Sequence, residues 1–118
     1  MIVGAAVVEL HVHGSQSLKE KRGVVRSIIG RLRNRFNVSV AEIGGQDTWQ
    51  RAVIGVAATG NDRTWLRGQL RRAIEFIDDM HLAEITDSDI EVLELCYGER
   101  DRTDDEDEQQ PGEPGAEE

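Results

Sequence analysis

The chain has 118 residues and a formal net charge of −9, with 23 acidic and 14 basic side chains. A chain of this length forms one domain with a modest hydrophobic core. Its single cysteine, Cys96, excludes an intrachain disulfide, and no stretch approaches the ~20 apolar residues of a membrane span, so we expect a cytoplasmic protein with no membrane partner.

The negative charge is concentrated at the C-terminal end. Residues 99–118 carry ten acidic and two basic side chains, a net charge of −8, whereas residues 1–98 carry a net charge of −1. The same segment contains two prolines and almost no apolar residue, so burial cannot offset the entropy that ordering would cost. We predict a folded domain over residues 1–97 and a disordered acidic tail over residues 98–118.

Residues 2–13 alternate in the manner of a β-strand. The even-numbered positions are apolar throughout. The odd-numbered positions begin apolar and end polar, in the order Val3, Ala5, Val7, Glu9, His11 and His13. This pattern predicts a central strand with one buried face and one partly uncovered face.

Residues 17–36 have the apolar period of an amphipathic helix. Ser17 is a suitable N-cap, and Glu20 three residues later completes a capping box. The core side of this helix consists of Leu18, Val25, Ile28, Ile29, Leu32 and Phe36. Asn37 ends the helix, and residues 38–43 form the second predicted strand.

The remaining elements follow from turn signals and a second helical period. The turn at 44–47 predicts a hairpin to a strand at 51–59. A second helix over 63–80 has either Asn61 or Asp62 as its N-cap. The last apolar segment, 83–95, is interrupted by polar residues, so we expect a strand in two pieces.

The order βαββαβ predicts an α+β fold, a ferredoxin-like two-layer sandwich with an antiparallel sheet and both helices on one sheet face. We further expect the first and third strands to run parallel in the centre of the sheet. That arrangement would bring the arginine-rich starts of both helices to one end of the molecule.

The first helix is strongly basic. Its seven cationic side chains are accompanied by one acidic residue, Glu20. Three of the cations lie in the first turn, where the helix dipole disfavours positive charge. Along one edge of the apolar face lie Lys19, Arg22, Arg26 and Arg33. Two interpretations remain open, a solvated helix face and an anion-binding surface.

Residues 17–42 and 46–57 closely resemble the YlxP-like family of small bacterial proteins. The resemblance covers residues 1–95 and excludes the tail. The matching motif positions are Ser17, Leu18, Lys19, Lys21, Arg22, Asn37, Ser39, Glu42, Trp49, Gln50 and Arg51. The resemblance implies a ferredoxin-like fold. It also implies a role near RNA, because genes of the family tend to lie among those for translation initiation and ribosome maturation. It supplies no catalytic residue.

Trp49 ends the hairpin turn and lies next to Arg51. An exposed indole beside a cation can stack an unpaired base, and the alternative is an apolar plug over the sheet edge. Trp65, on the flank of the second helix, is expected to pack. The two central strands lack the aromatic residues that RNA-binding sandwiches of this topology use, so RNA would be held chiefly through its phosphates.

Catalytic and metal sites have little support in the sequence. Glu9, His11 and His13 share one strand face, but a zinc site needs its ligands held in a pocket, and a half-exposed strand end explains them better. The chain has no phosphate-binding glycine loop, and Cys96 has no placed histidine. We predict no metal, no cofactor and no enzymatic activity.

We therefore predict a non-enzymatic protein that binds RNA or a ribosomal particle in translation or ribosome maturation. The candidate contacts are Lys19, Lys21, Arg22, Arg26, Arg33, Trp49 and Arg51. The alternatives are a protein-interaction module or homodimer, which would use the uncovered sheet face at Val3, Ala5 and Val7, and a small-anion sensor. We also consider that the acidic run at 104–108 folds back over the basic helix end and competes with nucleic acid.

Overall fold

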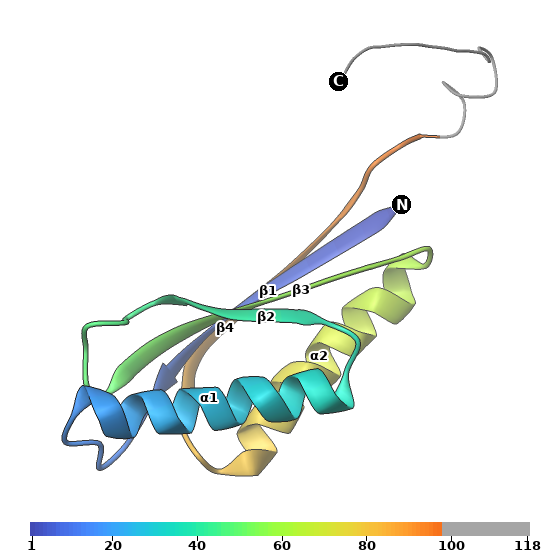
Figure 1. Ribbon diagram of the computed structural model, residues 1–118. Coiled ribbons are helices and arrows are strands. Elements are labelled where there is room, and N and C mark those ends of the chain that lie inside the picture. Colours follow the sequence, from blue (N-terminus) through green and yellow to red (C-terminus); the bar gives the residue numbers. More distant parts are fainter. Residues whose placement is uncertain (98–118) are drawn as a thin grey trace.

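The computed structural model describes residues 1–97, which form four strands and two helices in the order β1, α1, β2, β3, α2, β4. The elements are β1 (Ile2–His11), α1 (Leu18–Arg35), β2 (Ser39–Gly44), β3 (Arg51–Gly60), α2 (Arg63–Met80) and β4 (Glu84–Glu94). The strands form one antiparallel sheet in the order β2-β3-β1-β4, and both helices cover the same face of it (Figure 1). The predicted ferredoxin-like sandwich is confirmed. The predicted tail and its acidic run lie outside the described residues.

The core lies between the sheet and the helix layer. The even-numbered side chains of β1 point into it, as predicted, and Val8 and Leu10 are fully or almost fully buried. The helices contribute their apolar faces, with Ile28, Leu32, Leu66, Leu70, Ala73 and Ile77 at 0% exposure. Gly4 permits a close approach of α2, because a Cβ at this position would lie 2.8 Å from Leu70 Cδ1.

Both helices begin at side-chain caps. The Glu20 N–H donates to Ser17 Oγ over 3.1 Å, and the Glu20 carboxylate accepts from the Gln16 N–H over 2.7 Å, one residue earlier than in a standard capping box. In α2 the cap is Asp62, which accepts from the Trp65 N–H over 2.9 Å. The structure therefore decides between the two caps that the sequence allowed.

The two helices begin at opposite ends of the molecule. β1 and β3 are antiparallel, with Ile2 opposite Gly60 and His11 opposite Arg51. The start of α1 therefore lies near the β2–β3 hairpin, and the start of α2 lies at the other end of the sheet (Figure 1). The expectation of parallel central strands and one shared basic end is wrong. The crossover through α1 makes β2 parallel to β1, and the hairpin then reverses β3.

β4 is one continuous strand with a register shift, and the prediction of two pieces is wrong. Leu10 pairs with Ile85, but Glu9 pairs with Asp87, so Thr86 is an extra residue in β4. The Thr86 hydroxyl donates to the Glu9 carbonyl over 3.3 Å. This β-bulge absorbs the polar stretch without ending the strand.

The second face of the sheet is not covered by any element of residues 1–97, and we call it the open face. Ala5 and Val7 of β1 are exposed on it, and Val3 is partly exposed, in agreement with the alternation in the sequence. Neither α1 nor α2, the helices of the described residues, is long and apolar enough to cross a membrane.

Candidate nucleic-acid interface

Three exposed cations follow one edge of α1, and we call Lys19, Arg22 and Arg26 the α1 stripe. Their spacing of three and four residues places them on adjacent turns of the same edge. Within residues 1–97, none of the ion pairs formed at up to 4.0 Å involves these three side chains. The stripe therefore presents positive charge that no carboxylate of the described domain neutralises.

Arg33 continues this edge towards the C-terminal end of α1. Its guanidinium donates to the Val40 carbonyl of β2 over 2.7 Å, although the residue as a whole is exposed. This bond fixes the end of α1 to the edge strand β2. On the other edge, the Arg35 guanidinium carbon lies 5.4 Å from the Phe76 ring centroid of α2. The stripe therefore borders β2, and the opposite edge of α1 borders α2.

Lys21 does not belong to this surface. Its side chain is at 0% exposure, and Nζ donates to the Gly45 and Arg51 carbonyls and lies 3.2 Å from Glu42 Oε2. Glu42 Oε2 is buried and accepts no hydrogen bond of regular geometry from the described residues. Within these residues, the ionic contact with Lys21 is what offsets the cost of burying its charge. The prediction that Lys21 contacts nucleic acid is wrong, because the side chain lies on the core face of α1.

The buried Lys21 links the start of α1 to the β2–β3 hairpin. The Gln50 side chain donates to the Ser15 carbonyl over 3.2 Å and adds a second link. Gly45 adopts φ 74° inside this hairpin, and a Cβ there would lie 2.7 Å from the Arg51 carbonyl oxygen. Two of the motif positions, Lys21 and Gln50, thus hold the hairpin against the start of α1.

The hairpin presents Trp49 to solvent. Its side chain is 55% exposed, so it is not a buried plug over the sheet edge. Arg51 follows in β3, and its guanidinium donates to the Glu9 carboxylate over 2.9 Å. The charge of Arg51, the cation predicted beside Trp49, is therefore partly neutralised by a carboxylate of the neighbouring strand β1.

A second basic surface lies on α2, at the other end of the molecule. A shallow pocket of about 470 Å³ is lined by Arg63, Thr64, Trp65, Arg67, Gly68, Arg71 and Arg72. Of the four arginines that line this pocket, Arg63 has partners in β4. Its guanidinium donates to the Val92 carbonyl over 3.1 Å and lies 3.9 Å from the Glu94 carboxylate. Trp65 is 55% exposed, and the expectation that it packs is wrong.

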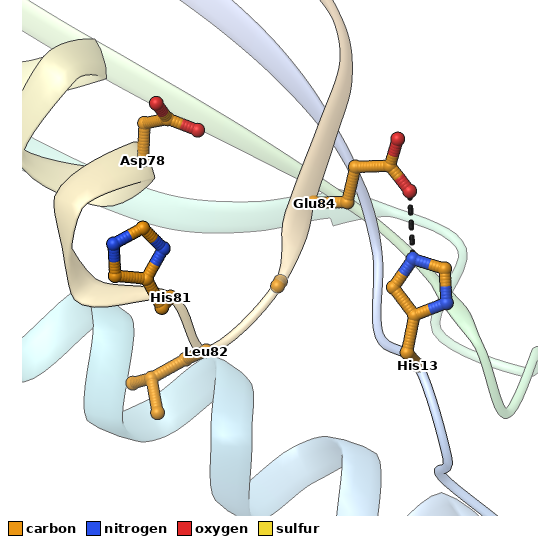
Figure 2. Close-up of a pocket in the computed structure, with 6 residues that line it drawn as sticks. His13, Asp78, His81, Leu82 and Glu84 are labelled. Atoms are coloured by element: carbon orange, nitrogen blue, oxygen red, sulfur yellow. Dashed lines mark hydrogen bonds and ion pairs between the residues drawn. The ribbon is translucent and has the colours of Figure 1, made fainter.

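The histidines near the end of β1 and the end of α2 lie around a pocket of about 350 Å³. Figure 2 shows His13 paired with Glu84, at 2.6 Å between Nε2 and Oε1, while Asp78 of α2 and His81, the residue that caps its C-terminal end, lie across the pocket. Glu9, which shares the strand face of His13, is paired with Arg51. No group of three or more His, Cys, Asp or Glu side chains in residues 1–97 has the arrangement of a metal site.

Residues 3–90 match the family described as protein of unknown function (DUF503). The chain belongs to this family. Over 85 residues it is 44% identical to the uncharacterized protein YlxP of Bacillus subtilis (strain 168), a match that covers 72% of this chain and 92% of that protein. The resemblance to the YlxP-like family is confirmed.

Solved structures with a similar chain path have low sequence identity. SnoaB, a cofactor-independent oxygenase from Streptomyces nogalater, has a TM-score of 0.47 at 13% identity, covering 82% of this chain and 96% of its own. Acylphosphatase from Bacillus subtilis has a TM-score of 0.42 at 13% identity, covering 83% of this chain and 91% of its own. We take nothing about activity from these similarities.

Proposed function

We propose that this protein is a non-enzymatic, cytoplasmic RNA- or ribosome-associated protein that acts in translation or ribosome maturation and binds RNA phosphates through the α1 stripe. The observation that carries the proposal is the row of exposed cations without carboxylate partners in residues 1–97. From Lys19 to Arg26 the row extends over about 10 Å, because a helix rises about 1.5 Å per residue. It can therefore contact successive phosphates of one strand.

The position of the stripe supports an anionic partner. Lys19 and Arg22 lie next to the N-terminal end of α1, where the helix dipole is already positive. In the isolated domain this placement is unfavourable, and a bound phosphate turns it into an attraction. The exposed Trp49 hairpin lies at the same end, since Lys21 of α1 bonds to the Gly45 and Arg51 carbonyls that flank it.

Non-enzymatic action is supported by the surroundings of the nucleophilic side chains. Cys96 is exposed beyond the end of β4. Ser15 Oγ donates to the Ser17 carbonyl over 3.1 Å, and Ser17 Oγ caps α1. The Ser15 and Ser17 hydroxyls therefore have structural partners rather than a general base.

The test is co-sedimentation of the full chain with ribosomal particles at low and moderate salt. The test variant replaces Lys19, Arg22 and Arg26 by Ala. The control variant removes the same charge from the pocket of α2 by replacing Arg67, Arg71 and Arg72 by Ala. We expect the first variant to lose co-sedimentation and the second to retain it. Equal retention by both variants, or loss only in the α2 variant, would contradict the proposal.

A second candidate function, protein interaction, is favoured by a different observation, the apolar side chains of the open face.

A further inference from the structure

The open face has an apolar centre. On three adjacent strands it presents Val7 of β1, Ile43 of β2 and the small residues Gly55 and Ala57 of β3. Val7 is 43% exposed and Ile43 is 54% exposed, and Leu93 of β4 adds a further apolar side chain at 49%. Ile43 leans over Gly55, since a Cβ at Gly55 would lie 3.2 Å from Ile43 Cγ2. The apolar side chains are therefore contiguous, which is unusual for a surface that stays in water.

The face is divided by charge. β4 adds a row of acidic residues to it, formed by Asp87, Asp89 and Glu91, which pair in register with Glu9, Val7 and Ala5 of β1. At the other side, the residues of β2 on this face are Ser39, Ala41 and Ile43. The face is thus acidic along one edge strand and uncharged along the other.

The size of the face suits a dimer. The strands β1 to β4 have 10, 6, 10 and 11 residues, and at about 3.3 Å per residue and about 4.8 Å between strands they give roughly 600 Å² of flat area per copy. Two such faces bury roughly 1,000 to 1,200 Å², which reaches the about 1,000 Å² that a biological interface needs and suits a weak, concentration-dependent dimer. An apolar centre with a polar border is also the usual anatomy of such an interface.

We propose that a second copy of this chain covers the open face, in a two-fold dimer with sheets packed face to face. The acidic row of β4 decides whether the two-fold axis of the dimer runs across the strands or along them. An axis across the strands would place the two β4 rows on each other, and like charges would repel. An axis along the strands instead places each β4 over the partner's uncharged β2.

This inference does not depend on the proposed binding of RNA. The α1 stripe belongs to the helix layer, and the open face is the opposite surface of the sheet (Figure 1). In the dimer both stripes stay exposed on the outer sides. An open-face variant that loses the dimer therefore has an intact stripe, and its co-sedimentation with ribosomes reports on the first proposal alone.

The test is sedimentation equilibrium of the full chain over a range of concentrations, with a matched pair of substitutions at Ile43. Ile43→Glu and Ile43→Lys both remove the same exposed side chain from an edge strand. In the proposed dimer the new glutamate faces the partner's acidic row, whereas the new lysine is attracted to it. We expect Ile43→Glu to raise the dimer Kd about tenfold or more above that of Ile43→Lys. Trp65→Glu, an equally exposed apolar site in the helix layer, is the control and should leave the Kd unchanged.

Three results would overturn the inference: a monomeric wild-type chain at every concentration, equal Kd values for the two Ile43 variants, or a Trp65→Glu variant that dissociates like Ile43→Glu. A milder substitution guards against loss of folding. In a Cys96→Ser background, Ala57→Cys should react with a bulky maleimide more slowly as the protein concentration rises. The control Arg31→Cys, on the exposed outer side of α1, should react at one rate throughout. A concentration-independent rate at Ala57→Cys contradicts the dimer.

Discussion

The outer edge of α1 and the open face of the sheet are both exposed, but they are exposed in different chemical ways. The α1 stripe consists of cations with no carboxylate partner in residues 1–97. The open face consists of apolar side chains that nothing in residues 1–97 covers. Each surface costs free energy in the isolated domain, the first through charge repulsion and the second through hydration. We therefore propose a different kind of partner for each surface, an anion for the stripe and a second sheet for the face.

The largest effect should come from Lys21, which is adjacent to Arg22 in sequence but lies on the buried face of the helix. Lys21→Met leaves the largely buried Glu42 carboxylate without its cation, and breaking such a pair costs about 3 kcal/mol or more. We expect a marked loss in the free energy of unfolding, measured by urea denaturation. The double variant Lys21→Met/Glu42→Leu should recover most of it, because no charge is then left without a partner. A single variant as stable as wild type would show that Lys21 does not anchor the hairpin.

A smaller effect is expected at Gly45, which shapes the hairpin that carries Trp49. Gly45→Ala introduces a Cβ 2.7 Å from a backbone oxygen at a positive φ, and should destabilise the fold by about 2 kcal/mol. Gly23→Ala is the control, because a Cβ at Gly23 meets no atom within 4 Å and a helical alanine is favourable. Thermal unfolding should place the two variants on opposite sides of the wild-type Tm.

The caps of α2 give a further comparison. Asp62→Ala removes the acceptor of the Trp65 N–H and should cost about 1 kcal/mol. Asn61→Ala, one residue earlier, should leave the stability close to that of wild type. Urea denaturation of the two variants distinguishes them, and equal losses would mean that the assigned cap is incorrect.

The smallest effect on stability should come from Arg22→Ala. The residue is exposed and forms no ion pair with residues 1–97, and its charge is unfavourable in the first turn of α1, so the unfolding midpoint should stay the same or rise slightly. Binding of single-stranded RNA should weaken, and the log–log salt slope should fall by about 0.7. The pair Lys21 and Arg22 would then separate stability from binding at neighbouring positions. A lower midpoint with unchanged RNA affinity would reverse their roles.

The limits of the elements were predictable because they depend on local signals. Apolar periods and the caps Ser17 and Asp62 place the helices within one or two residues of their observed ends. The direction of α2 was predicted wrongly although connectivity determines it, since one crossover and one hairpin make β3 antiparallel to β1. The continuity of β4 was not predictable in the same way, because the bulge at Thr86 depends on pairing with β1.

The candidate site was predicted only in part. Lys21 was predicted to lie on the surface because it was grouped with the other cations by charge. Its spacing indicated the core face of α1, since Val25 and Ile28 follow it by four and seven residues. Glu42, on the core-facing side of β2, was the second available signal for a buried pair. The pairing of Arg51 with Glu9 depends on the register of β1 with β3, which the sequence did not determine. For Lys19, Arg22, Arg26 and Trp49, exposure agrees with the prediction, and binding remains to be measured.

The central claim is tested most directly by the salt dependence of RNA binding. Fluorescence anisotropy with a labelled single-stranded RNA would measure Kd from low to moderate salt, for the full chain and for the variant with Ala at positions 19, 22 and 26. We predict that the wild-type slope exceeds the variant slope by about 2, since each lost phosphate contact removes about 0.7. Equal slopes, or no binding by the wild-type chain at low salt, would contradict the account.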